Sequence, residues 1–355
     1  MSPLSFYAGP KALAYIKQNG FTPEMFSAVL GASGGPKWFV LTGLDKVLFN
    51  DFMHKSTHHV DIIGSSVGAF RAACFAQDNP GAAISRLAEG YSNTVYSEKP
   101  SVQEITQKGS VLLGEMMGEN GVEQVLNCVN KTVHIVVARC HGLTACESKL
   151  KQYSGLMLAA LRNFQSREQL NKSFTRIVFS SSNKAFSFSE KHKFITENVQ
   201  LNESNFLTSL MASGSIPAVI EGVKDINGAK PGMFRDGGII DYHFDMQIET
   251  SGLVLYPHFY SKPTPGWFDK SLKSRSCHES SYDNVLMLAP SDDFVAKLPF
   301  GKIPDRNDFK YLPAQDRIKY WTKVIAESDR LAESFLEAAE KQSLADLIQP
   351  INLKR

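Results

Sequence analysis

The feature that most constrains this chain is the pentapeptide 64–68, Gly-Ser-Ser-Val-Gly, which has the pattern G-x-S-x-G. A short apolar stretch typical of a strand precedes it, and residues 69–76, which are typical of a helix, follow it. Glycines on both sides of a serine tolerate a strained turn and leave space for another molecule to approach the hydroxyl. The N–H groups at the start of the helix would also favour negative charge beside the serine. The pattern therefore predicts an elbow in which Gly64 and Gly68 hold Ser66 as an activated nucleophile.

A second glycine-rich turn precedes this pentapeptide in the chain. Residues 31–37, Gly-Ala-Ser-Gly-Gly-Pro-Lys, lie between a strand-like stretch at 26–30 and a helix-like stretch at 38–49. Pro36 stands where the first helical turn would begin, and its missing N–H costs nothing there. A turn of this kind offers N–H donors to an anion, either a phosphate or the oxyanion of an acyl-transfer intermediate.

The phosphate alternative fits the residues of this turn poorly. A nucleotide P-loop has Gly directly before its Lys and Ser or Thr directly after it, whereas Pro36 precedes Lys37 and Trp38 follows it. Magnesium would then lack its hydroxyl ligand, and the glycines of a dinucleotide fingerprint are not at the required offsets. The residues therefore favour the oxyanion interpretation. The binding of ATP or GTP to residues 31–37 is the least favoured hypothesis, after an acyl hydrolase and an inactive binding module.

A candidate general base lies in the segment 235–241, Arg-Asp-Gly-Gly-Ile-Ile-Asp. An Asp followed by two glycines usually marks a turn. Such a turn can also bring the Asp236 carboxylate to the end of a sheet with little hindrance from its own backbone. Asp236 lies 170 residues after Ser66 (236 − 66 = 170), so the fold has to bring the two side chains together.

Taken in order, these motifs resemble the patatin-like phospholipase family. That family carries a glycine-rich oxyanion turn, a G-x-S-x-G nucleophile elbow, an A-S-x-x-x-P segment and then a D-G-G or D-G-A motif. The corresponding stretches of this chain are residues 33–37, 64–68, 211–219 and 236–238. The resemblance thus extends over roughly residues 26 to 245, and the ordered set of four motifs is much more specific than the elbow alone.

The glycine turn departs from the family's G-x-G-x-x-G pattern. Ser33 stands at the first glycine position and Trp38 at the last, and Lys37 takes the place of an Arg. The resemblance still implies an oxyanion hole here, for which the N–H groups of Gly34 and Gly35 are the expected donors and Lys37 a structural or electrostatic support. The same departures suggest the competing hypothesis, a catalytically inactive lipid- or protein-binding module with the same fold.

The mechanism that the resemblance implies uses a catalytic dyad. Ser66 would attack an ester carbonyl, and Asp236 would accept its proton and return it to the leaving alcohol. A free Asp titrates near pH 4, so the site has to raise this pKa by burial or stabilise the oxyanion strongly. A Ser–acid–His triad would also fit the order of the chain, because His243, His258 and His278 follow Asp236. The resemblance favours the dyad.

Strand-like and helix-like stretches alternate along the chain, which predicts a three-layer α/β fold with a mostly parallel central sheet and helices on both faces. The expected strands are residues 28–30, 60–63, 133–138, 176–180, 253–255 and 285–288. The expected helices are residues 11–18, 38–49, 67–77, 84–96, 150–164 and 206–212. Both glycine turns leave the carboxyl ends of their strands, where functional loops gather in such folds.

Two parts of the chain are expected. The resemblance implies a patatin-like catalytic domain over residues 1–312, and a C-terminal helical segment over residues 313–355 is expected to pack on it. Residues 313–347 have a helical pattern, and the apolar positions share one side: Ile318, Trp321, Ile325, Leu331 and Phe335.

Composition narrows the class of protein. The chain has 355 residues, of which 43% are hydrophobic and 21% charged, which is typical of a globular protein with a large core. The formal net charge of +2 and the lack of a basic stripe with aromatics argue against a nucleic-acid partner. No apolar run reaches about 18 residues, and the N-terminus lacks a signal-peptide pattern. Five scattered cysteines indicate reduced thiols in the cytoplasm, and no spaced ligand set predicts a metal or another cofactor.

The implied substrate is the acyl ester of a phospholipid or another glycerolipid, reached from the cytoplasm at a membrane surface. Residues 256–268, rich in aromatics and proline, are most simply a loop packed on the core. With Lys270, Lys273 and Arg275 they could also form a lid or a peripheral membrane contact. Residues 112–117 are a second candidate for the wall of an acyl-chain site, against the simpler reading of a core helix.

Overall fold

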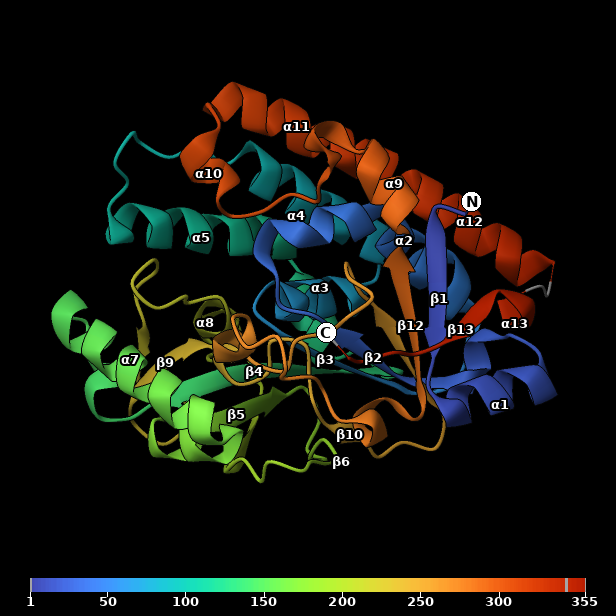
Figure 1. The fold of residues 1–355 in the computed structure, drawn as a ribbon. Helices are drawn as coiled ribbons and strands as arrows, with labels where there is room; N and C mark the ends of the chain where they lie inside the picture. The colour runs from blue at the N-terminus through green and yellow to red at the C-terminus, as the bar shows by residue number, and fades with distance from the viewer. Residues whose placement is uncertain (1, 342–343, 355) are drawn as a thin grey trace.

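The computed structural model describes residues 2–341 and 344–354. A central sheet of mostly parallel strands is covered by helices on both faces (Figure 1). The strand order is β13-β1-β12-β11-β2-β3-β4-β5-β7, and β9 also pairs with β4 and carries β8 at its side. This is a three-layer α/β fold, which confirms the predicted fold class.

Each of the six predicted strands lies within an observed strand. The strands of the sheet are β1 (Leu4–Ala8), β2 (Phe26–Gly31), β3 (Val60–Ser65), β4 (Lys131–Cys140), β5 (Phe174–Ser180), β7 (Thr196–Gln200), β8 (Val223–Lys224), β9 (Met233–Asp236), β11 (Leu253–Pro257), β12 (Val285–Pro290) and β13 (Ile348–Pro350). A separate ribbon pairs β6 (Phe188–Ser189) with β10 (Gln247–Ile248). The run from β12 through β11, β2 and β3 to β4 is parallel, whereas β5 and β9 run antiparallel to β4. The carboxyl ends of the parallel strands therefore share one edge of the sheet.

The helices of the two outer layers are α1 (Pro10–Asn19), α2 (Thr42–Val47), α3 (Val67–Phe75), α4 (Pro80–Asn93), α5 (Val102–Met117), α6 (Gly121–Leu126), α7 (Lys149–Gln165), α8 (Phe206–Ser213), α9 (Asp292–Lys297), α10 (Asp308–Tyr311), α11 (Ala314–Glu327), α12 (Asp329–Glu340) and α13 (Leu344–Leu347). The single helix predicted over residues 38–49 is wrong. A 3-10 turn (Gly35–Leu41) precedes α2 and a π-helical turn (Leu48–Phe52) follows it. Residues 38–41 are all completely buried, so tertiary packing overrides the helical pattern there.

The predicted C-terminal helical segment contains three helices, α11, α12 and α13, and then the strand β13, which joins the central sheet. The first helix, α11, ends where the Ser328 hydroxyl accepts a hydrogen bond from the N–H of Gly43 at 2.8 Å, and α12 then packs on α2. Of the predicted apolar side, Trp321, Leu331 and Phe335 are buried. A domain boundary at residue 313 stays a prediction, and residues 1, 342–343 and 355 of the proposed parts lie outside the described residues.

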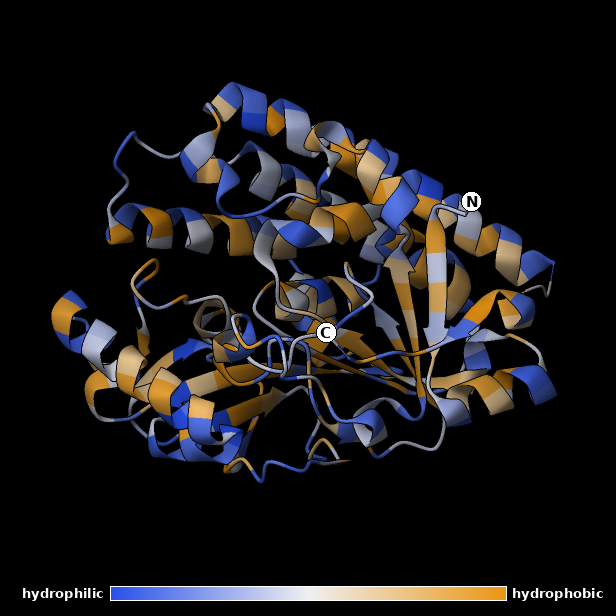
Figure 2. Ribbon diagram, viewed as in Figure 1, coloured by the Kyte–Doolittle hydropathy of each residue, from blue (hydrophilic) through white to orange (hydrophobic). Residues whose placement is uncertain are grey.

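Hydrophobic residues gather in the central strands and on the inner sides of the helices (Figure 2). A second, smaller core lies under α7 and contains Leu156, Ala159, Leu170, Phe174 and Ile240. Within residues 2–341 and 344–354, no helix is both long enough and apolar enough to cross a membrane.

Candidate active site

The register along β4 explains how two motifs far apart in the sequence meet. On one edge of β4, the parallel strand β3 extends to Ser65, which lies opposite Val136. From Val137 onward β9 pairs with β4 antiparallel, and Asp236 lies opposite Val137. Because β5 occupies the other edge of β4, β3 and β9 share one edge and approach each other end to end. Ser66, the residue after β3, is thereby brought to Asp236.

The two predicted catalytic side chains are in direct contact. The Ser66 hydroxyl donates a hydrogen bond of 2.8 Å to Oδ2 of Asp236, and Oδ1 accepts one of 2.7 Å from the N–H of Gly238. Ser66 is only 8% exposed and Asp236 only 7% exposed. Burial raises the pKa of Asp236 above its ordinary value, and it outweighs the opposing effects of these hydrogen bonds and of the positive charge of Arg306. The carboxylate is therefore a stronger base than a free Asp and already holds the serine proton in a hydrogen bond.

Ser66 has a strained backbone, with φ at 55° and ψ at −133°. The glycines around it allow this turn. A Cβ on Gly64 would lie 2.2 Å from the carbonyl oxygen of Gly68, and a Cβ on Gly68 would lie 1.9 Å from that of Gly31. The N–H of Ser66 donates to the hydroxyl of Ser213 at 2.9 Å, which holds the turn in place. Helix α3 begins at the next residue, so its positive end lies beside the serine.

The glycine turn after β2 lies beside this elbow. Ser33 joins the two, because its hydroxyl lies 2.5 Å from the hydroxyl and 3.1 Å from the carbonyl oxygen of Ser65. The N–H groups of Gly34 and Gly35 donate no hydrogen bond to any described residue, and both glycines line the same cavity as Ser66. They can therefore donate to an anion in that cavity. Their role as an oxyanion hole stays a prediction.

Lys37 and Trp38, the other departures from the family pattern, have separate structural surroundings. The Lys37 ammonium forms an ion pair with Asp305 in the cavity wall, so it fastens the glycine turn to the segment 299–311. Trp38 is completely buried and its ring packs against Phe39, with centroids 5.2 Å apart. The residue that replaces the last glycine of the pattern thus contributes to the core.

The histidines that follow Asp236 lie in three different environments. His243 lines the cavity, and its Nδ1 accepts a hydrogen bond of 2.8 Å from the N–H of Thr264. His258 is completely buried, and burial lowers its pKa to about 3, so it is neutral at physiological pH. His278 is exposed and caps a short 3-10 turn. The Ser66 hydroxyl donates to the carboxylate of Asp236, and the dyad stays a prediction.

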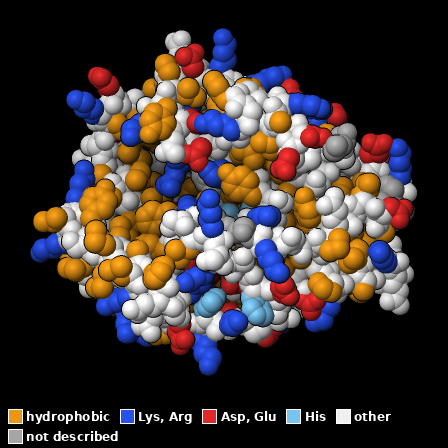
Figure 3. All heavy atoms as spheres, in the orientation of Figure 1, with side chains coloured by type: hydrophobic (Ala, Val, Ile, Leu, Met, Phe, Trp, Pro, Cys, Tyr) orange, Lys and Arg blue, Asp and Glu red, His pale blue; other side chains and the backbone are white. Residues whose placement is uncertain are grey.

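A cavity of about 1460 Å³ opens above Ser66 and Asp236. Figure 3 shows this face of the molecule hollowed, with hydrophobic side chains around the hollow. The cavity is larger than the roughly 300–1,000 Å³ of an ordinary small-molecule site. Its apolar lining comes from Tyr91, Tyr96, Pro100, Ile105, Ile216, Pro217, Val219, Ile220 and Phe309. An extended acyl chain would fit a lining of this kind.

Residues 112–117 belong to a core helix, which confirms the simpler of the two interpretations, and they do not form a wall of the cavity. Leu112, Leu113, Met116 and Met117 are buried in the main core, because this end of α5 packs on α4. The same helix contributes Ile105 to the cavity instead.

Basic residues also line the cavity, among them Lys262, Lys270, Lys273, Lys302 and Arg306. Arg306 lies against the glycine turn, because a Cβ on Gly35 would be 3.3 Å from its Cγ. Lys270 is an exposed residue that lines the cavity. Desolvation of its ammonium and then repulsion from Arg306 and Lys37 lower its pKa to about 7. No motif in the sequence pointed to Arg306, which lies in a loop between two helices.

The aromatic segment 256–268 is mostly a packed wall of the cavity. Tyr256, His258 and Phe259 are completely or almost completely buried, whereas Tyr260 is 41% exposed. Phe259, Tyr260 and Trp267 line the cavity. The simpler interpretation, a loop packed on the core, therefore describes most of this segment.

Among the described residues, no group of three or more His, Cys, Asp or Glu is placed to hold a metal ion. The five cysteines are free thiols: Cys74, Cys128, Cys140, Cys146 and Cys277. Burial raises the pKa of the Cys74 and Cys277 thiols, so both stay protonated at neutral pH.

The chain has only distant similarity to known proteins. No family model matches the chain, and a search of curated proteins found no significant match. Among solved structures, the crystal structure of VipD from Legionella pneumophila matches with 14% sequence identity and a TM-score of 0.33. The match covers 77% of this chain and 56% of that chain, so the chain spans little more than half of the VipD structure.

Proposed function

We propose that the chain is a lipid acyl hydrolase, a serine carboxylic ester hydrolase of the phospholipase or lysophospholipase type. The observation that carries the proposal is the 2.8 Å hydrogen bond from the Ser66 hydroxyl to the buried carboxylate of Asp236. Ser66 lies on a strained turn, and both residues line a large, partly apolar cavity. Such a turn exposes the hydroxyl to a bound ester, and a carboxylate with a raised pKa is a suitable general base.

The first half of the reaction forms an acyl-enzyme. Oγ of Ser66 attacks the ester carbonyl carbon while its proton passes to Asp236, and the N–H groups of Gly34 and Gly35 donate to the resulting oxyanion. Lys37 supports the turn that carries these donors, through its ion pair with Asp305. When the tetrahedral intermediate collapses, the C–O bond to the alcohol breaks and the Asp236 proton goes to the leaving oxygen.

The second half releases the fatty acid. A water molecule gives a proton to Asp236 and attacks the acyl carbonyl, and the same two N–H groups hold the oxyanion. Collapse then returns the proton to the Ser66 oxygen and leaves the free acid in the cavity. The net reaction consumes one ester bond and one water molecule, and it releases the alcohol and the fatty acid.

Two features of the cavity lining, its apolar residues and its basic residues, support a phospholipid as the substrate. Burying an acyl chain against the apolar lining gains about 0.8 kcal/mol for each methylene removed from water. Lys270 and Arg306 line the same cavity, and an arginine fork binds phosphate oxygens well. We therefore infer that the ester is close to an anionic headgroup, which would bring the protein to a membrane surface.

The test is hydrolysis of a short chromogenic ester by the wild type, Ser66→Ala and Asp236→Asn. We expect both variants to lose at least about 1,000-fold in kcat while they remain folded, because each removes one partner of the proton transfer. A fluorophosphonate probe should label Ser66 in the wild type, as located by mass spectrometry. Retained hydrolysis by Ser66→Ala would overturn the proposal. Lipid binding without any labelling would support the inactive lipid-binding module instead.

A further inference from the structure

Helix α7 turns an apolar face toward the solvent. Six large apolar side chains on it are 42–79% exposed: Leu150, Tyr153, Met157, Leu158, Leu161 and Phe164. At 3.6 residues per turn, all of them except Leu158 fall within an arc of roughly 80°. We call this continuous row of five, Leu150, Tyr153, Met157, Leu161 and Phe164, the α7 stripe. The opposite side of the helix is buried in the small second core through Leu156 and Ala159, so the α7 stripe lies in the middle of the solvent-facing side.

The charges along α7 match an anionic surface. Lys149 and Lys151 lie at the first turn, on either side of the α7 stripe, and residues 148–165 contain no Asp or Glu. Arg162, at the last turn, instead donates a hydrogen bond of 2.9 Å to the hydroxyl of the buried Ser173. Figure 3 shows hydrophobic side chains on this part of the molecule with lysine and arginine side chains beside them. An exposed apolar row between basic flanks is typical of a helix that lies in the plane of a membrane interface. Isolated apolar side chains are common on protein surfaces, but five that adjoin on one face of a helix form a patch typical of an interaction site.

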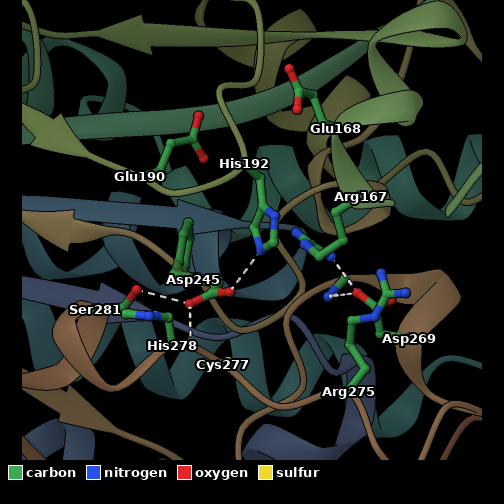
Figure 4. Close-up of polar contacts among 12 residues, drawn as sticks. Arg167, Glu168, Glu190, His192, Asp245, Asp269, Arg275, Cys277, His278 and Ser281 are labelled. Carbon is green, nitrogen blue, oxygen red and sulfur yellow. Dashed lines mark hydrogen bonds and ion pairs between the residues drawn. The ribbon is translucent and has the colours of Figure 1, made fainter. Parts of the chain in front are cut away.

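The end of α7 is fixed to the loop that lines the cavity. The two terminal nitrogens of Arg275 donate to carbonyl oxygens in the last turn of α7, at 3.0 and 3.2 Å. The amide of Asn163 donates to Asp269 at 2.7 Å, and Arg167 forms an ion pair with the same carboxylate. Figure 4 shows Arg167, Asp269 and Arg275 gathered at this junction. Trp267, in the same short turn as Asp269, lines the cavity. An external surface that binds α7 would therefore also lie close to the cavity wall.

We propose that the α7 stripe docks the protein on the surface of an anionic phospholipid bilayer. The apolar side chains enter the boundary between headgroups and acyl chains, while Lys149 and Lys151 lie at the level of the phosphates. A second copy of the chain is the weaker candidate, because face-to-face packing would bring the same basic flanks together. Docking requires neither Ser66 nor Asp236, so the inference goes beyond the proposed hydrolysis and can fail or hold independently of it.

The test is co-sedimentation of the full chain with lipid vesicles, in the Ser66→Ala background so that no lipid is hydrolysed. We expect binding to phosphatidylcholine vesicles that contain about 30% phosphatidylserine and much weaker binding to phosphatidylcholine alone. The double variant Met157→Glu/Leu161→Glu should bind at least about tenfold more weakly, because charge would enter the interface. Lys149→Gln and Lys151→Gln should each cost about fivefold, and only on the anionic vesicles.

A matched control tests whether the effect belongs to α7. Val129 is 92% exposed and lies just before β4, at the end of the sheet opposite to the cavity, so Val129→Glu should bind like the parent protein. A tryptophan in the place of Met157 should shift its emission to shorter wavelength when anionic vesicles are added. All of these side chains are exposed, so the variants should keep the melting temperature of the parent.

Two results would overturn the inference. One is equal vesicle binding by the parent protein and Met157→Glu/Leu161→Glu. The other is a dimer, seen by sedimentation velocity and abolished by the same double variant, together with no vesicle binding, which would assign the α7 stripe to a second copy. Vesicle binding that persists while the wild type fails to hydrolyse any ester would leave the docking surface standing and reject the proposed function alone.

Discussion

The Ser213 hydroxyl accepts a hydrogen bond from the N–H of Ser66 at 2.9 Å and donates one to the carbonyl oxygen of Val136 at 2.7 Å. Ser213 is the last residue of α8, so this helix holds the strained turn against β4. Asp236 pairs with the next residue of β4, Val137. Both members of the proposed dyad are therefore fixed to adjacent positions of one strand, which keeps their side chains in register.

Ser213→Ala should weaken both the fold and the activity. The substitution leaves a buried N–H and a buried carbonyl without their hydroxyl partner, which typically costs about 1–3 kcal/mol in the free energy of unfolding. We also expect kcat for a soluble ester to fall about tenfold, because the backbone of Ser66 can then relax. Ser209→Ala is the matched control, since its hydroxyl is equally buried but donates to a carbonyl of its own helix, that of Phe206. An unchanged kcat in Ser213→Ala, measured beside urea unfolding, would contradict this role.

Activity should depend on pH through Asp236, whose pKa is raised by burial. The dyad needs the ionised carboxylate, so kcat/KM falls as pH falls through the raised pKa, and its acid limb lies above the ordinary Asp value of about 3.9. A pH–rate profile on a neutral ester measures this limb. A limb at or below the ordinary value would show that the carboxylate is not the general base or is not desolvated.

The ionised form of Asp236, which activity requires, should lower the stability of the folded protein. A raised pKa means that ionised Asp236 destabilises the folded state above this pKa, and that protonation removes the cost as pH falls through it. Asp236→Asn should therefore raise the melting temperature at pH 7 while it abolishes hydrolysis. The difference in melting temperature should shrink at pH values below the folded pKa, where the wild type is also neutral. Calorimetry over the acid range measures it, and a large fall in melting temperature at pH 7 would contradict the prediction.

The local parts of the site could be predicted from the sequence, but their meeting could not. Alternating periodicity and the glycines around Ser66 were sufficient to predict the strand, the turn and the helix that carry it. The contact with Asp236 depends on β3 and β9 sharing one edge of β4, and β9 is a short strand that no periodicity marks. Only the order of the motifs, through the family resemblance, suggested that the two residues would come together.

The sequence analysis did not identify Arg306 or the exposed apolar side of α7, for two different reasons. Arg306 lies in an irregular segment between helices, and nothing in its neighbourhood has the spacing of a motif. The helix over residues 150–164 was predicted, but its apolar residues occupy two opposite sides. Periodicity does not reveal which side is buried, and here the side with Leu156 and Ala159 faces the core while the side with Met157 faces the solvent.

Ser33→Gly should weaken the site although it restores the glycine of the family pattern. The Ser33 hydroxyl contacts the hydroxyl and the carbonyl oxygen of Ser65, so its loss removes a buried hydrogen bond worth about 0.5–1.5 kcal/mol. The glycine adds a further roughly 0.5–1 kcal/mol of backbone entropy. We expect kcat to fall as the turn with Gly34 and Gly35 loosens. Ser33→Ala separates the two terms by removing the hydroxyl alone, and a variant as active and stable as the wild type would contradict the tie between the turns.

Arg306→Gln should separate recognition of the headgroup from the chemistry of the dyad. Arg306 lines the cavity beside the glycine turn, so we expect KM for a phosphate-bearing ester to rise about tenfold, whereas kcat/KM for a neutral ester at pH 8 changes little. The positive charge of Arg306 also lowers the pKa of Asp236, so its removal should move the acid limb of the profile to higher pH. Arg330→Gln, on the exposed surface of α12, is the control and should change neither quantity. Equal losses on the phosphate-bearing and the neutral ester, with an unmoved acid limb, would mean that Arg306 supports the cavity wall instead of binding the headgroup.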